Sequence, residues 1–306
     1  MKKNRHKYDP AALNSRLLRR PIQRCFPLFI LPTLIAFCIG FLYPFFLGLY
    51  RSFCTFTSPI DYHWQGFKNY INAFKDTGFF YAFRFTSIYA VVSIIVINVI
   101  AFALAYALTQ KLKGSNLFRT VFFMPNLIGG LVLGYIWKMI FGAILVHFGK
   151  QIVTDATLGF WGLVILVAWQ QIGYMMIIYI AGLQAVPEDM LEAAKIDGAN
   201  RWQTLWRVTI PNVMPSITIC VFLTLTNSFK LFDQNLALTE GKPIETLANG
   251  TQIGWTRMLA MHISETNEIG NRMKGQAQAE AVIFFLIVAV LALIQLRATR
   301  KKEVQQ

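Results

Sequence analysis

The sequence has 306 residues, of which 55% are hydrophobic and only 14% are charged, and its formal net charge is +14. This composition and a positive mean hydropathy of +0.47 exclude an ordinary soluble domain and indicate a membrane protein. The positive charge does not indicate nucleic-acid binding in this chain. Its basic residues gather in short segments between apolar runs, as they do in cytoplasmic loops of membrane proteins.

Spanning a hydrocarbon core about 30 Å thick takes roughly 20 helical residues. Apolar runs of that length predict an all-α integral membrane protein with six transmembrane helices near 26–50, 85–109, 119–142, 158–184, 212–234 and 277–297. Most basic residues then lie in segments on one side, which predicts that both termini are cytoplasmic. The predicted organisation is a basic cytoplasmic segment at 1–25, a membrane domain at 26–297 with a cytoplasmic loop at 185–211, and a cytoplasmic tail at 298–306.

The amino-terminal part combines a basic segment with the first apolar run. Residues 1–25 are suited to the anionic inner leaflet. The run Phe26 to Tyr50 is longer than the core of a signal peptide, and no small-residue cleavage site follows it, so we expect it to stay as a membrane helix. After it, residues 64–74 read WQGFKNYINAF, which predicts a short external helix near the membrane surface, where Tyr and Trp are favoured.

The third span contains Pro125 followed by Gly129, Gly130 and Gly134. Proline kinks a helix and glycine permits close backbone packing, so a kinked, closely packed helix is predicted. Lys138 lies near the external end of this span, and we expect it to reach the interface in preference to contacting a solute.

The fourth and fifth spans carry polar and aromatic residues. A polar solute needs hydrogen-bond partners and, for a sugar, aromatic rings on which its apolar faces can stack. The candidates for lining a pathway are Trp169, Gln170, Gln171 and Tyr174 in the fourth span and Asn227, Ser228, Phe229 and Asp233 in the fifth. The alternative is helix packing, because amides also bond neighbouring helices and aromatic rings fill gaps.

The loop between these two spans is polar and predicts a helix, a tight turn and a second helix. Pro187 suits the first turn of a helix, and Gly198 can adopt the left-handed conformation that closes one. Asn200 with Gln203 three positions on resembles a capping box for the second helix. Pro211, which lacks an amide hydrogen, is expected to end or bend this helix.

This loop resembles the cytoplasmic EAA loop of permease subunits of binding-protein-dependent ABC importers, in which E-A-A is followed by three residues, glycine and, about a dozen residues later, proline. Glu192, Ala193, Ala194, Gly198 and Pro211 occupy these positions. In that family the loop is a coupling helix seated in a cleft of the ATPase subunit. The resemblance implies a coupling role for Glu192, Ala193, Ala194, Asp197, Gly198 and Ala199. The alternative is an ordinary amphipathic loop.

Two further segments resemble sugar permeases of the maltose and glycerol-3-phosphate group. The external helix matches G-x-x-N-Y-x-x-x-F at Gly66, Asn69, Tyr70 and Phe74, for which we expect a structural role. The segment after the fifth span matches F-D-x-x-x-x-L-T-x-G-G-P at Phe232, Asp233, Leu238, Thr239, Gly241 and Pro243. Lys242 replaces the second glycine, and since it adopts positive backbone angles less freely, the turn is expected to differ.

The sequence contains no phosphate-binding loop of the form G-x-x-x-x-G-K followed by Ser or Thr. The nearest string, residues 142–151, has the wrong glycine spacing and ends in Gln151, so ATP and Mg²⁺ are expected on a partner ATPase.

Carboxylates are almost absent from the spans, with Asp233 at a boundary, which argues against ion coupling. We expect no disulfide and no metal site from the four cysteines, Cys25, Cys38, Cys54 and Cys220. The four histidines, His6, His63, His147 and His262, are expected in loops and at interfaces, without a metal or proton-relay role.

The resemblance implies a type I ABC importer permease fold in a multi-pass protein of a prokaryotic cytoplasmic membrane. As a non-catalytic subunit, the chain would pair with a second homologous permease, bind two ATPase subunits, contact membrane lipid and receive a sugar or oligosaccharide from an extracytoplasmic binding protein. Glycerol-3-phosphate or another small polar solute is the alternative cargo. The less favoured alternatives are an exporter or amino-acid importer of the same family, an ion-coupled secondary transporter and a membrane enzyme.

Overall fold

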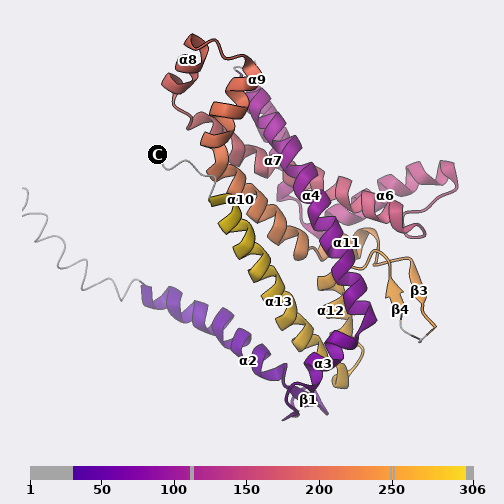
Figure 1. Ribbon diagram of the computed structural model, residues 1–306. Coiled ribbons are helices and arrows are strands. Elements are labelled where there is room, and N and C mark those ends of the chain that lie inside the picture. Colours follow the sequence, from indigo (N-terminus) through magenta and orange to yellow (C-terminus); the bar gives the residue numbers. More distant parts are fainter. Residues whose placement is uncertain (1–29, 111–113, 249, 251, 301–306) are drawn as a thin grey trace, which may run out of the picture. The chain divides into compact units, whose positions relative to one another are not determined.

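The computed structural model describes residues 30–110, 114–248, 250 and 252–300 (Figure 1). The predicted basic segment at 1–25, the start of the first span and the end of the tail lie outside these residues. The chain forms two compact units, Met1–Arg51 and Ser52–Gln306, which we describe separately.

The described part of the first unit is one helix, Ile30–Arg51. It contains a π-helical turn, η1 (Cys38–Leu42), followed by α2 (Tyr43–Arg51). Phe37, Phe41 and Phe45 are spaced four residues apart, and their rings stack at 5.2 and 6.4 Å between centroids. This spacing places them on one face of the helix, as expected for an apolar membrane span.

Within the described residues, six helices are long and apolar enough to cross a membrane, which confirms the predicted class. They are Ile30–Arg51, Thr77–Thr109, Gly130–Phe148, Ala156–Gln184, Arg201–Phe229 and Asn271–Arg300. The second begins before the predicted residue 85, because Asp76 caps α4 (Thr77–Thr109) by accepting a hydrogen bond from the Gly78 amide at 2.8 Å.

The core of the second unit lies between α4, α7 (Ala156–Gln184), α10 (Ile210–Phe229) and α13 (Asn271–Arg300). A buried polar chain joins three of these helices. Tyr179 of α7 donates to Asn98 of α4 at 2.7 Å, and Asn98 donates to Thr224 of α10 at 3.2 Å. Such bonds hold helices together where apolar side chains alone give little specificity.

The third predicted span, 119–142, is not one kinked helix, so this prediction was wrong. The chain forms α5 (Ser115–Phe123), a 3₁₀ turn η2 (Met124–Leu127), two extended residues, and then α6 (Gly130–Leu145). Pro125 is the second residue of the 3₁₀ turn, and the carbonyl of Ile128 accepts a hydrogen bond from the Gln170 side chain at 3.1 Å. An external donor thus satisfies a backbone group that a continuous helix would have paired internally.

The predicted close packing of α6 is confirmed at two glycines, Gly130 and Gly134, which face α11 (Asp233–Leu238). A β-carbon at Gly134 would lie 2.5 Å from the β-carbon of Ala237. The fifth span ends at Phe229, and α11 is a separate short helix beside α6 (Figure 1).

Short elements connect the long helices. An antiparallel hairpin, β1 (Cys54–Phe56) with β2 (Tyr62–Trp64), pairs Cys54 with Trp64. A second hairpin joins β3 (Ile244–Thr246) to β4 (Gln252–Gly254), with Ile244 opposite Gly254. Outside the 185–211 loop, the other short helical segments are α3 (Lys68–Lys75), the 3₁₀ turn η3 (Val146–Phe148) and α12 (Leu259–Glu268). Neither hairpin was predicted from the sequence.

The predicted short helix at residues 64–74 is present as α3, and its asparagine has a structural role, as expected. Asn69 is 2% exposed and donates to the carbonyls of Ser52 and Cys54, at 2.8 Å each.

In the turn after α11, positive φ angles occur at Glu240 (55°) and Gly241 (68°). Lys242 therefore does not need the freedom of the glycine that it replaces.

Candidate functional site

The first helix of the predicted coupling loop is α8 (Glu188–Ile196). It begins directly after Pro187, with Glu188 and Asp189 in its first turn and Lys195 in its last turn. These charges oppose the partial charges at the two helix ends and stabilise a short, exposed helix.

A left-handed turn closes α8, as the sequence predicted. Gly198 has φ of 75°, and its amide donates to the carbonyl of Lys195 at 3.1 Å. The amide of Ala199 donates to the carbonyl of Ala194 at 2.9 Å. This pair of bonds is a Schellman motif, and no described residue comes within 4 Å of the position of a β-carbon at Gly198. Glycine is therefore required by the backbone angle and not by lack of space.

The second helix begins with the predicted capping box. The Asn200 side chain accepts from the Gln203 amide at 2.9 Å, and the Gln203 side chain accepts from the Asn200 amide at 2.8 Å. The helix α9 (Arg201–Thr204) then continues through a π-helical turn, η4 (Leu205–Thr209), into α10.

Of the two outcomes predicted for Pro211, an end or a bend of this helix, the end does not occur, because the helix continues through it. Proline in an α-helix clashes with the carbonyl four residues earlier. Here the preceding turn is widened, and the Ile210 amide bonds to the carbonyl of Leu205, five residues back. The wider turn accommodates the proline, and the loop helix becomes one unit with the fifth span, Arg201–Phe229.

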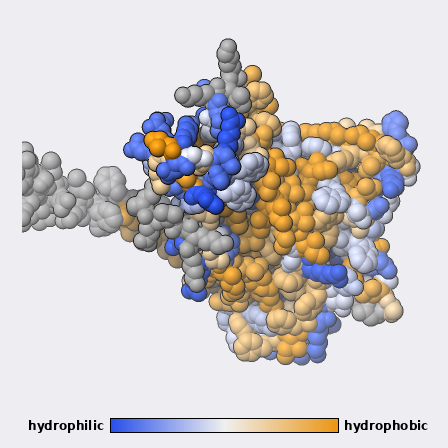
Figure 2. All heavy atoms as spheres, turned by 45° about the horizontal axis from the view of Figure 1, so that its top comes forward, coloured by the Kyte–Doolittle hydropathy of each residue, from blue (hydrophilic) through white to orange (hydrophobic). Residues whose placement is uncertain are grey.

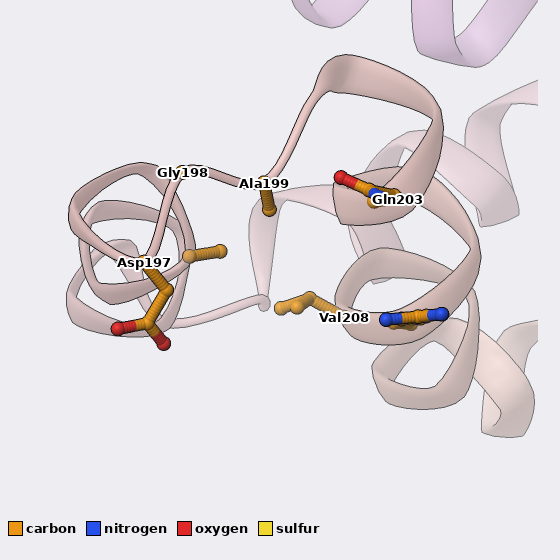
Figure 3. Close-up of a pocket in the computed structure, with 7 residues that line it drawn as sticks. Asp197, Gly198, Ala199, Gln203 and Val208 are labelled. Atoms are coloured by element: carbon orange, nitrogen blue, oxygen red, sulfur yellow. The ribbon is translucent and has the colours of Figure 1, made fainter.

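The two helices of the loop enclose a pocket of about 360 Å³. In Figure 3, the end of α8 with Asp197 and Gly198 lies on one side, and Gln203 and Val208 of the second helix lie on the other. The complete lining is Ala194, Asp197, Gly198, Ala199, Gln203, Arg207 and Val208. Four of the six predicted coupling residues therefore line one pocket, whereas Glu192 and Ala193 are exposed on α8 outside it.

The loop also exposes apolar side chains that the sequence analysis overlooked. Ile196 is 86% exposed, Trp202 is 69% exposed and Trp206 is 61% exposed. Figure 2 shows mostly hydrophilic residues over this end of the molecule, so these side chains stand out from a polar surface. The i, i+4 spacing of the two tryptophans could have identified them, since it places both on one helix face. Exposed large apolar groups on a polar loop indicate a contact surface.

Six of the eight predicted pathway residues separate into two groups, while Gln171 is partly exposed and Ser228 is 3% exposed. Trp169, Tyr174, Asn227 and Asp233 are exposed, and the Trp169 ring lies edge-on to Trp137, with 5.6 Å between ring centroids. These four side chains lie on the surface of this chain.

The other two pathway residues are packed into the protein. Phe229 is 2% exposed and packs with Ala90 and Leu225, which corrects its assignment to a pathway. Gln170 is 7% exposed, donates to Ile128 and accepts from Gln234 at 2.8 Å. Gln170 thus shows the helix-packing role that we considered as the alternative.

Lys138, which we expected to reach the interface in preference to contacting a solute, is partly exposed. It forms an ion pair with Glu240, which also accepts from Lys242 at 2.7 Å. The hydrogen bonds from Lys138 and Lys242 outweigh the effect of burial and lower the pKa of Glu240 to about 2. The carboxylate therefore stays charged throughout the neutral range and joins α6 to the turn after α11.

His262 and Glu280 differ from the sequence-based expectations. His262 lies neither in a loop nor at an interface: it is in α12 and 6% exposed. Glu280 lies within the sixth predicted span and is 0% exposed. It is a carboxylate inside a span, where the sequence analysis expected almost none. Both meet Asp76, in a cluster that no sequence spacing reveals.

Comparison with known proteins shows one consistent likeness. The family profile described as binding-protein-dependent transport system inner membrane component matches residues 111–303. The probable starch degradation products transport system permease protein AmyD of Thermoanaerobacterium thermosulfurigenes is 43% identical over 91% of this chain and 94% of its own. The multiple sugar-binding transport system permease protein MsmF of Streptococcus mutans is 30% identical, over 90% and 95%.

The fold is also similar to that of a chain in the crystal structure of a bacterial ABC transporter involved in the import of the acidic polysaccharide alginate. The TM-score is 0.75 at 21% identity, over 93% of this chain and 98% of the other. The same transporter in complex with an alginate pentasaccharide-bound periplasmic protein matches with a TM-score of 0.73 at 20% identity, over 92% and 96%. At these identities the likeness concerns the fold.

Proposed function

Since the chain belongs to the family of binding-protein-dependent transport system inner membrane components, we propose that it forms, with a second permease subunit, the membrane pathway of an ABC importer. The cargo is a sugar or oligosaccharide. The family is one of transporter permeases, so this chain is a membrane subunit and not the ATPase.

One observation supports the mechanism most strongly: the E-A-A helix α8 is exposed and is joined, through the turn at Gly198, to a helix that continues into the membrane. The ATPase would seat α8 in its cleft, with Ile196 and the pocket beside Gly198 at the contact. Because Arg201–Phe229 is continuous, a displacement of α8 would move the fifth span as a lever. ATP-driven closure of the ATPase subunits would thereby turn the pathway from inward-facing to outward-facing.

The assembly follows from this mechanism. Two ATPase subunits hold ATP and Mg²⁺ on the cytoplasmic side, where the 185–211 loop and both termini of this chain also lie. A solute-binding protein delivers the cargo at the opposite face. The chain is then a multi-pass protein of a prokaryotic cytoplasmic membrane.

A carbohydrate cargo is supported by two observations. The relatives AmyD and MsmF are named for starch degradation products and for multiple sugars. In this chain, the exposed Trp169 and Tyr174 on α7 offer rings on which the apolar face of a sugar can stack, and Asn227 and Asp233 offer hydrogen bonds.

The test is substrate-stimulated ATP hydrolysis by the membrane complex purified through this chain, reconstituted in lipid with its copurifying binding protein. We expect stimulation by one member of a panel of oligosaccharides. Stimulation by glycerol-3-phosphate alone would assign the alternative cargo. A complex without an ATPase subunit, or uptake that persists without ATP and follows an ion gradient, would contradict the proposal.

The pathway assignment makes a separate prediction for Trp169. Its replacement by alanine removes a stacking platform worth about 1 kcal/mol, so sugar uptake at low concentration should fall roughly fivefold, since 1.4 kcal/mol is a factor of ten. Trp161→Ala is the matched control, because Trp161 lies on the same helix and is 49% exposed, against 43% for Trp169. The uptake of labelled sugar by proteoliposomes is measured for both variants. Equal losses of uptake in the two variants would contradict a pathway role for Trp169.

A further inference from the structure

Three side chains that could bind a metal ion meet at one end of α4, α12 and α13. Asp76 immediately precedes α4, His262 lies in α12, and Glu280 lies in α13. One ligand atom from each lies within 4.8 Å of the others. His262 Nε2 is 3.4 Å from Asp76 Oδ2 and 3.8 Å from Glu280 Oε2.

The facing atoms of this cluster are largely buried, and His262 lies at ion-pair distance from both carboxylates. The side chains of His262 and Glu280 are 8% and 0% exposed, and that of Asp76 is 19% exposed. Neither His262 Nε2 nor Glu280 Oε2 has a hydrogen-bond partner among the described residues. A buried polar atom without a partner is costly, and a buried carboxylate is costlier still. The arrangement therefore favours an occupant between the three side chains.

The rest of the site orients the carboxylates toward that position. Asp76 Oδ1 accepts from the Gly78 amide at 2.8 Å, and Glu280 Oε1 accepts from Gln276 Nε2 at 2.9 Å. Asp76 Oδ1 and Glu280 Oε1 are thus held by the protein. The second oxygens face His262 Nε2, and Asp76 Oδ2 also accepts from Gln276 Nε2 at 3.4 Å. Supporting hydrogen bonds of this kind are typical of metal ligands, because they fix the orientation of the coordinating group.

The position of the imidazole is also restricted. The ring of Phe79 lies edge-on to it, with 6.1 Å between the ring centroids. A β-carbon at Gly78 would approach His262 Cε1 to 3.0 Å, so the glycine leaves room for the ring. His262 is thus held with Nε2 toward both carboxylates.

We propose that Asp76, His262 and Glu280 bind a divalent transition-metal ion of the zinc class. Ligand atoms about 2.1 Å from a tetrahedral ion lie roughly 3.4 Å apart, close to the separations observed here. One imidazole and two carboxylates are ligands that zinc accepts, and the two negative charges balance the ion. The ion would join the start of α4 to α12 and α13, which follow it by roughly 200 residues in the sequence, independently of the proposed transport function.

The experiment uses the full chain in its purified complex, prepared without a histidine tag, stripped with EDTA and then incubated with ZnCl₂. After gel filtration, we expect about one more zinc per copy of this chain than in variants His262→Ala and Glu280→Gln. Zinc should also raise the apparent Tm of the parent protein but not of the variants. His63→Ala is the matched control, because His63 also pairs with an aspartate, Asp61 at 3.3 Å, but is exposed, and it should bind zinc as the parent does.

A second measurement does not depend on the folding of any variant. Co²⁺ added to the stripped parent complex should give the visible absorption of a tetrahedral ion, and Zn²⁺ should displace it. Equal zinc content in the parent, His262→Ala and Glu280→Gln would overturn the proposal. A parent complex that binds neither ion would overturn it as well.

Discussion

Gly198→Val is expected to uncouple ATP hydrolysis from uptake. Valine at a φ of 75° is strained by about 1–3 kcal/mol, so the Schellman turn that closes α8 should open or rearrange. The end of α8 then loses its defined position relative to the helix that enters the membrane. We expect uptake in proteoliposomes to fall about tenfold or more, since 1.4 kcal/mol corresponds to a factor of ten, while basal ATP hydrolysis and subunit assembly persist.

The matched control for this variant is Gly149→Val. Gly149 has a φ of 65° and, like Gly198, no described residue within 4 Å of the position of a β-carbon. It lies in the turn after η3, far along the chain from the coupling loop. Its replacement imposes similar backbone strain, so uptake per assembled complex should stay near that of the parent. Normal uptake by an assembled Gly198→Val complex would contradict the coupling role.

Gly173→Ala is expected to destabilise the membrane domain. A β-carbon at Gly173 would overlap the backbone carbonyl of Phe122, at the end of α5. Alanine normally favours a helix over glycine by about 1 kcal/mol, but overpacking costs about 1–3 kcal/mol and involves backbone that cannot move like a flexible side chain. We expect overpacking to dominate, with the apparent Tm of the detergent-solubilised protein lowered by roughly 2–10 °C.

Gly142→Ala provides the opposite case in a helix of the same unit. Gly142 lies in α6, and no described residue comes within 4 Å of the position of its β-carbon. Here only the helix propensity of alanine acts, so the apparent Tm should stay unchanged or rise slightly. If both variants melted like the parent protein, the close approach of α5 to α7 at Gly173 would be incorrect.

Local sequence determined the spans and the architecture of the coupling loop. The length of an apolar run depends on adjacent residues, so the local sequence predicts six such runs, and six helices of spanning length are present among the described residues. The turn at Gly198 and the capping box of Asn200 with Gln203 also depend on atoms within a few residues of one another. Such features can be predicted because the interacting groups are adjacent in the chain.

Tertiary structure alone decided the features that depend on distant partners. The break in the third span leaves a carbonyl at Ile128 that accepts a hydrogen bond from Gln170, 42 residues away. Phe229 resembles a pathway residue in sequence, but α4 buries it. Asp76, His262 and Glu280 have no common spacing and meet because three helices converge. Burial and long-range pairing depend on how helices pack, and no local pattern of residues encodes that arrangement.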